Sequence, residues 1–82
     1  MKSRVAYNGG RRFWNTASKV KAILEVIQPG EVVDGRTIAK RLQERGYQVN
    51  EGSIKMFIYY HMLHRYLKKV RKGGVNHYTL LS

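Results

Sequence analysis

Apolar side chains recur every three or four residues in three stretches of the chain, the spacing of a helix with one buried face. Before the first stretch, Asn15 and Thr16 are both able to cap a helix, and Pro29-Gly30 lies beyond its last apolar position. We therefore predict an amphipathic helix between these signals. Its expected apolar positions are Ala17, Val20, Ile23, Leu24 and Ile27.

The second and third helices are expected to begin with the same device, a polar N-cap residue flanked by two apolar residues that pack on one another. The second helix should end at Gly46, since glycine readily takes the left-handed conformation of a helix end, and the third should cover residues 51–63. The two capping sets are Val33, Asp34 and Ile38, and Val49, Asn50 and Ile54. The third helix is expected to gather Ile54, Phe57, Ile58, His61 and Met62 on one side.

After the third helix the pattern changes to that of a β-hairpin. Two strand-like segments, residues 67–72 and 75–81, flank the turn-forming pair Gly73-Gly74. Val32-Val33 is long enough to add a third, short strand beside the hairpin. The alternative is that the third helix continues through residues 66–81.

The register of this hairpin depends on the length of its turn. A two-residue turn pairs Val70 with His77, whereas a connection of three or five residues pairs Val70 with Tyr78. We expect the longer connection, because it keeps Val70, Tyr78 and Leu80 on one face of the sheet.

Charge is distributed unevenly along the chain. The 82 residues include Lys+Arg 16 against Asp+Glu 5, a formal net charge of +11, and no cysteine. These numbers fit one small domain without disulfides or thiolate metal sites. All five acids lie within residues 22–51, so residues 1–21 and 52–82 form two acid-free basic blocks. The blocks predict a positive face that attracts a polyanion, nucleic acid above all; the alternative is a basic surface that serves solubility alone.

Two segments of the chain are distinguished by periodicity. Residues 1–15 show none and are expected to form a basic N-terminal arm, and residues 16–82 are expected to form one domain. The longest uncharged apolar run, from Met56 to Leu63, is too short to span a membrane, and the first residues lack the apolar stretch of a signal peptide. We therefore expect a cytoplasmic protein, associated with the nucleoid if it binds DNA, with no membrane partner.

The order helix, short strand, helix, turn, helix and hairpin resembles the winged helix-turn-helix family of DNA-binding domains. The resemblance covers residues 16–82 and implies a mainly α fold with a small β-sheet: three helices, a short first strand and a C-terminal β-hairpin wing. The residues that carry it are Val32-Val33, the second-helix run Arg36-Thr37-Ile38-Ala39-Lys40-Arg41-Leu42, Gly46, Ile54, Ile58 and the wing end Tyr78-Thr79-Leu80.

In that family the third helix lies in the major groove, the second spans the DNA backbone, and the wing reaches an adjacent groove or phosphates. The face expected in the groove lacks Arg, Asn and Gln, which make the best bidentate base contacts, so shape and phosphate contacts are expected to dominate. Carried onto this chain, the groove candidates are Ser53, Lys55, Met56, Tyr59 and Tyr60, the backbone candidates are Arg36, Thr37, Lys40 and Arg41, and the wing candidates are Lys68, Lys69, Arg71 and Lys72.

The arm lies outside the family pattern. Arg11 and Arg12 suit a phosphate or minor-groove contact, with an arm that does not order as the alternative. Trp14 is expected to cover the core rather than to insert beside DNA.

Several side chains that could bind a ligand or a metal can also be explained by packing roles. Tyr59 and Tyr60 could stack on bases or complete the core, and we expect at least one to be exposed because a helix cannot bury both beside Ile54 and Ile58. The histidines at 61, 64 and 77 make a poor metal set without cysteine or a nearby acid, so we expect packing roles, no metal and no cofactor. We also expect no enzyme activity, because no paired carboxylates or nucleophile with its base stand out.

Three functions fit this pattern. The first is a small transcriptional regulator, expected to bind double-stranded DNA as a homodimer on a two-fold site. The second is an architectural protein that coats duplex DNA with little sequence preference, as nucleoid and chromatin proteins do. The third, less favoured, is a winged helix used for RNA or protein contacts.

Overall fold

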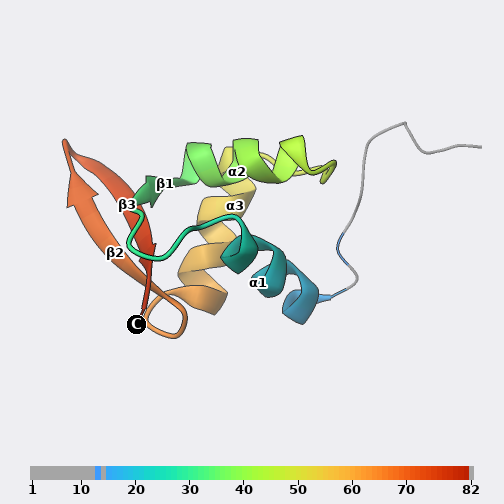
Figure 1. Ribbon diagram of the computed structural model, residues 1–82, viewed down its shortest axis with the longest axis horizontal. Helices are drawn as coiled ribbons and strands as arrows, with labels where there is room; N and C mark the ends of the chain where they lie inside the picture. The colour runs from blue at the N-terminus through green and yellow to red at the C-terminus, as the bar shows by residue number, and fades with distance from the viewer. Residues whose placement is uncertain (1–12, 14, 82) are drawn as a thin grey trace, which may run out of the picture.

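The computed structural model describes residue 13 and residues 15–81. Within them the chain forms three helices and one small antiparallel sheet, in the order that the sequence predicts (Figure 1). The hairpin projects from one end of the helical part. The elements are α1 (Thr16–Glu25), β1 (Val33–Asp34), α2 (Gly35–Glu44), α3 (Glu51–Phe57), a π-helical turn η1 (Ile58–Met62) that continues α3, β2 (Leu67–Lys72) and β3 (Val75–Leu80).

Each helix begins at a predicted polar cap. Of the two candidates for α1, Asn15 is the cap: its side chain accepts from the Ser18 N–H at 2.9 Å, and Ser18 Oγ accepts from the Asn15 N–H at 3.2 Å. Asp34 and Asn50 each accept from the backbone N–H three residues later, both at 2.8 Å. Side-chain oxygens thus satisfy amide groups that the first helical turn leaves without partners.

The core draws on every helix and strand. The helix α1 ends at Glu25, earlier than expected, but its next two residues, Val26 and Ile27, stay buried in tight turns whose N–H groups bond to Ile23 and Leu24. The side chains buried almost completely are Ile23, Ile38, Leu42, Ile54, Ile58, Met62 and Leu67.

The sheet confirms the hairpin and the added short strand, which is Val33–Asp34 rather than Val32-Val33. The strand order is β1-β3-β2, with β3 in the middle. The expected register is wrong, however: Val70 pairs with His77, and Gly73-Gly74 forms a two-residue turn. Both glycines have positive φ, 58° and 78°, the conformation of the tight hairpin turn that matches strand twist. The geometry of the turn, rather than the grouping of apolar side chains on one face, sets the register. Val70 therefore lies on the face of the sheet opposite to the buried Tyr78.

The third helix has the expected extent but not a uniform geometry. From Ile58 to Met62 the backbone widens into a π-turn, closed by a 2.8 Å hydrogen bond from the Leu63 N–H to the Ile58 carbonyl. Ile58 and Met62 are both buried in the core, as expected, whereas His61, expected on the buried side, is exposed. The chain then turns through His64, whose φ of 68° is left-handed, and enters β2 rather than continuing as a helix.

Among the residues that the structure describes, none of the helices has the length and apolar character needed to cross a membrane.

Candidate nucleic-acid interface

The face of α3 and η1 that points away from the core is rich in aromatic and apolar side chains. Met56, Tyr59 and Tyr60 are 62%, 66% and 69% exposed, the highest values among the large apolar side chains of the described residues. Ser53 is exposed in the first turn of α3. This surface carries four of the five groove candidates, and it is much less polar than a helix that reads bases through hydrogen bonds.

Lys55, the fifth groove candidate, is held closer to the protein. Its side-chain stem packs against Gly35 at the start of α2. A Cβ added at Gly35 would lie 2.5 Å from Lys55 Cγ. Its Nζ lies 3.4 Å from Glu51 Oε2, one helical turn earlier. Lys55 therefore ties α3 to the start of α2 and offers only part of its charge to a ligand.

The two tyrosines of the groove face lie side by side in the π-turn. Tyr59 and Tyr60 lie within η1, and their rings meet edge to face, with centroids 5.1 Å apart and planes at 86°. The expectation that at least one is exposed is confirmed, since both are. Ile58 and Met62 are buried on the opposite side of the turn, and the two exposed tyrosines between them can present ring faces to a ligand.

The backbone candidates on α2 divide into two groups. Arg36 and Lys40 are exposed and line a shallow hollow beside Glu51 at the start of α3. Thr37 is half-buried, and its N–H is taken by the Asp34 cap. Hydrogen bonds from the Thr37 side chain and backbone lower the pKa of Asp34. Arg36 and Lys40 are thus the α2 residues best placed to meet a phosphate backbone.

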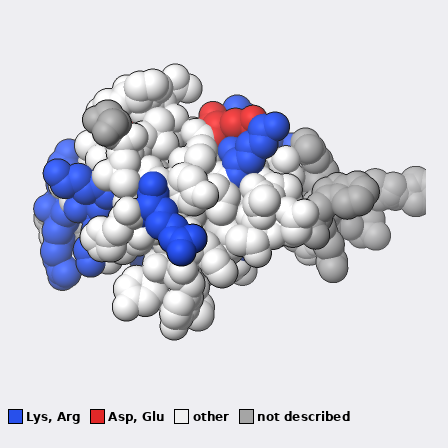
Figure 2. Space-filling view, turned by 90° about the horizontal axis from the view of Figure 1, so that it is seen from below, with Lys and Arg blue, Asp and Glu red and all other residues white. Residues whose placement is uncertain are grey.

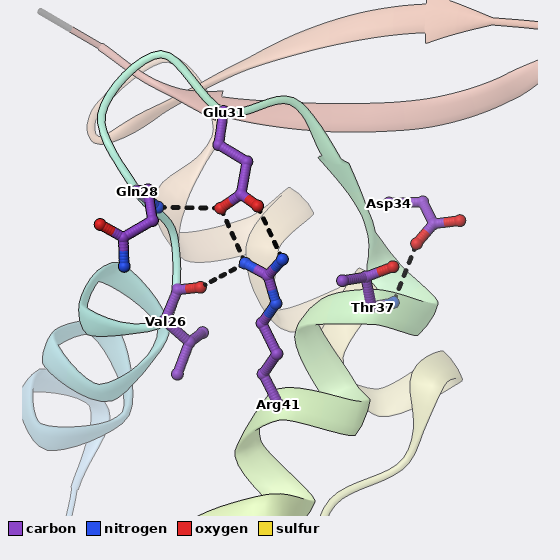
Figure 3. A network of polar contacts seen from close by, with 6 residues as sticks. All are labelled: Val26, Gln28, Glu31, Asp34, Thr37 and Arg41. Atoms are coloured by element: carbon purple, nitrogen blue, oxygen red, sulfur yellow. Dashed lines mark hydrogen bonds and ion pairs between the residues drawn. The ribbon is translucent and has the colours of Figure 1, made fainter.

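Arg41 has a structural role that the sequence does not predict (Figure 3). Its guanidinium donates to both carboxylate oxygens of Glu31, at 2.7 and 2.6 Å, and to the Val26 carbonyl at 2.8 Å. Glu31 Oε1 also accepts from the Gln28 N–H at 3.0 Å. These hydrogen bonds lower the pKa of Glu31 to about 2, first through Arg41, and raise the pKa of Arg41. Arg41 fastens the loop after α1 to α2, and its guanidinium is already engaged in these bonds.

All four wing candidates are exposed on β2, and basic side chains gather at the hairpin end of the molecule in Figure 2. The register divides them between the two faces of the sheet. Lys69 pairs with Tyr78, and Arg71 pairs with Asn76, which places both on the face that packs toward the core. Lys68 and Lys72 lie on the opposite face. The expected register would have given the reverse assignment.

A pocket of about 310 Å³ lies where α3 and η1 meet this face of the hairpin. Met56, Tyr59 and Tyr60 line it from the helical side, and Lys69 and Asn76 line it from the strands. Asn76 Oδ1 is buried without a hydrogen-bond partner among the described residues. Burying an acceptor without a donor costs about 1–3 kcal/mol, so a ligand that donates a hydrogen bond here would be favoured. Sequence reasoning missed Asn76, although its place two residues before Tyr78 on the same strand puts it on the face of Tyr78 in either register.

Most of the predicted arm lies outside the described residues, including Arg11, Arg12 and Trp14. Phe13 is described, and its ring stacks on Tyr47 with centroids 4.4 Å apart. Lys19 lies over this ring and over Phe57, at 5.5 and 4.6 Å from their centroids, and burial lowers its pKa. Phe13, near the end of the predicted arm, therefore packs against the domain.

Among the described side chains, no group of three or more His, Asp or Glu is placed to hold a metal ion. The Nδ1 atom of His77 lies 3.0 Å from the Val75 carbonyl, a contact within its own strand.

Comparison with known proteins gives no further guidance: no family model, no curated protein and no solved structure matches this chain.

Proposed function

We propose that the chain is a DNA-binding protein with a winged helix-turn-helix fold, acting as a small transcriptional regulator. The element order, a helix, a short strand, two further helices and a C-terminal hairpin, supports the fold. In this proposal α3 enters the major groove, Arg36 and Lys40 contact the backbone beside it, and the hairpin contacts phosphates as the wing. A homodimer on a two-fold site is part of the same proposal.

One observation carries the proposal. The pocket between α3, η1 and the hairpin joins the exposed side chains of the helix to Lys69 of the wing in one continuous surface. Arg71 extends the same face of the sheet toward the hairpin tip. A single extended polyanion could therefore contact helix and wing together, and the formal net charge of +11 favours its approach.

A second candidate function has its own support. Between Glu51 and Met62 the exposed side chains include no Arg, Asn or Gln, so the helix has few groups for bidentate base contacts. An architectural protein, which holds duplex DNA through phosphates and shape, needs none. This alternative differs from the regulator in sequence preference rather than in the surface used.

Binding measurements at several salt concentrations test the proposal. Five to eight phosphate contacts would make log K fall against log salt with a slope of roughly −4 to −7. A slope near zero would contradict a nucleic-acid face. At one physiological salt concentration, a preference for a selected duplex over random duplex above ~10³ would favour the regulator, and equal affinities would favour the architectural protein. Tighter binding to structured RNA than to either duplex would contradict both.

A further inference from the structure

The pocket between η1 and the hairpin has the composition of a binding site for a flat, partly polar group. Its volume, about 310 Å³, is at the lower end of the range for ligand pockets, about 300–1,000 Å³. Met56, Leu63 and three tyrosines give it apolar walls, and Asn76 and Lys69 provide polar groups at the hairpin side. A nucleobase combines an aromatic face with hydrogen-bonding edges, which matches this distribution.

The two exposed tyrosines are arranged to take such a group. Their rings stand at 86° to each other, so a flat group stacked on one ring presents its edge to the other. Both are largely exposed although they are large and partly apolar, and they lie in the π-turn between the buried Ile58 and Met62. Stacking of bases on exposed aromatic side chains, beside a positive groove, is how proteins hold unpaired strands.

Charge favours a nucleic acid as the occupant. Lys69 lines the pocket, and Arg71 lies on the same face of the sheet two residues closer to the tip. No acidic residue lines the pocket among the residues that the structure describes. Phosphates on either side of a bound base would therefore meet positive side chains.

Asn76 provides the means to recognise the edge of a base. Its Oδ1 has no hydrogen-bond partner within the described part of the chain, and an amide turns about its last side-chain bond, so that either the oxygen or the NH₂ group can face the ligand. A base edge offers both donors and acceptors to such an amide.

We propose that this pocket takes one unpaired nucleobase, stacked on Tyr59 or Tyr60, while the neighbouring basic side chains hold the adjoining strand. The inference rests on the proposed function, because it places the base next to duplex held by α3 and the wing. It gives the protein a preference for duplexes in which a base is already unpaired, since extruding a paired base costs unstacking energy.

The test uses three DNA probes and the full chain. The probes are an intact duplex, the same duplex with one bulged nucleotide, and the same duplex with an abasic residue in the bulge. The two bulges have the same backbone length and charge and differ only in the base, so their affinity ratio reports on the base. We expect the bulged base to bind about tenfold more tightly than the abasic bulge, which corresponds to about 1.4 kcal/mol.

Matched variants assign the effect to the pocket. The double variant Tyr59→Leu/Tyr60→Leu keeps apolar bulk but removes both rings and should bring the ratio to about one. Tyr59→Phe/Tyr60→Phe keeps the rings and should retain the preference. Tyr66→Leu is the control, because Tyr66 is 42% exposed but lies outside this pocket. Thermal unfolding of each variant checks that it folds.

The outcomes separate the two proposals. A ratio of one in the unchanged protein, with the intact duplex still bound, overturns the base pocket and leaves the proposed function standing. Failure to bind the intact duplex contradicts the proposed function instead. A ratio of one together with self-association that the double leucine variant abolishes would assign the patch to contact between copies of the chain, and would also overturn the inference.

Discussion

Lys69 lies directly opposite Tyr78 in the hairpin, so an exposed lysine and a tyrosine that is only 4% exposed share one face of the sheet. Val33 pairs with the same tyrosine from the other side. The buried part of this face rests on the core, whereas Lys69 lines the pocket beside α3 and Arg71 lies on the same face nearer the hairpin tip. Hairpin register thus decides which basic side chains can act together with the helix.

The first prediction compares the two faces of β2. Replacing Lys69 and Arg71 with Ala should weaken binding to every duplex and make the salt slope less negative by about one unit for each phosphate that the protein no longer neutralises. Replacing Lys68 and Lys72 removes the same charge from the same strand but from the opposite face, and should have a smaller effect on both quantities. Salt-dependent affinity of both variants for random duplex checks this. Equal effects would show that only net charge matters.

The second prediction concerns the turn that sets this register. Gly73 has a φ of 58°, where an L side chain costs about 1–2 kcal/mol. Gly73→Ala should therefore lower the free energy of unfolding by about that amount, although no atom lies within 4 Å of the added Cβ. Gly73→Asn should lower it less, because asparagine tolerates this conformation in tight hairpin turns. Denaturant unfolding of both variants is the measurement, and equal decreases would contradict the conformational explanation.

Local signals in the sequence predicted much of the fold. Polar caps flanked by apolar residues placed the starts of α2 and α3, because capping depends on residues within one helical turn. The paired glycines placed the hairpin, and helical spacing identified Ile54, Ile58 and Met62 as buried. Each of these features is determined by neighbours close in sequence.

The features that the sequence did not predict have different origins: the hairpin register was wrong because the local geometry of the Gly73-Gly74 turn outweighs apolar matching, whereas the bond from Arg41 to Glu31 joins distant segments. The π-turn leaves no mark in the apolar pattern, since Ile58 and Met62 share a face in an ordinary α-helix as well. The bond between Arg41 and Glu31 spans ten residues and depends on how α1 and α2 pack. On an exposed helix face, a basic residue that binds phosphate and one that braces a loop have the same sequence pattern, so the bond from Arg41 to Glu31 could not be predicted from the sequence.

The third prediction follows from the lowered pKa of Glu31. Its pKa is about 2 in the folded chain, against an ordinary value of 4.5, so the carboxylate stabilises the fold above about pH 4.5 and this contribution disappears as the pH falls toward 2. Glu31→Gln should lower stability at pH 7 and flatten its decline between pH 4.5 and 2. Asp34, whose pKa is also lowered, accounts for part of the decline that remains.

Urea unfolding at several pH values checks the Glu31 prediction. Glu25→Gln is the matched control, because Glu25 lies in a longer and more exposed ion pair, 3.5 Å from Arg45. An equal change of slope in both variants would mean that general charge repulsion, rather than the bond to Arg41, governs acid unfolding.

The fourth prediction concerns the contact between Gly35 and Lys55. A Cβ at Gly35 would lie 2.5 Å from Lys55 Cγ and 2.9 Å from its Cδ, so Gly35→Ala must displace the lysine stem. We expect this crowding to lower the free energy of unfolding by about 1 kcal/mol. In a Lys55→Ala background the same substitution should be neutral or stabilising, because alanine favours a helix more than glycine does. A double-mutant cycle of unfolding free energies measures this coupling, and additive effects would contradict it.

The fifth prediction separates base reading by α3 from holding of the backbone. Replacing Lys55, Met56 and Tyr59 with Ala should weaken binding to a preferred duplex more than to random duplex if the helix reads bases, because removing a base contact costs about 1–3 kcal/mol only where the right base is present. Replacing Arg36 and Lys40 should weaken both duplexes alike, since phosphates carry no sequence information. Affinities of both variants for the two duplexes at one salt concentration check this. If the helix substitutions weaken preferred and random duplexes equally, the regulator loses its mechanism, and the architectural protein becomes the better account of the same surface.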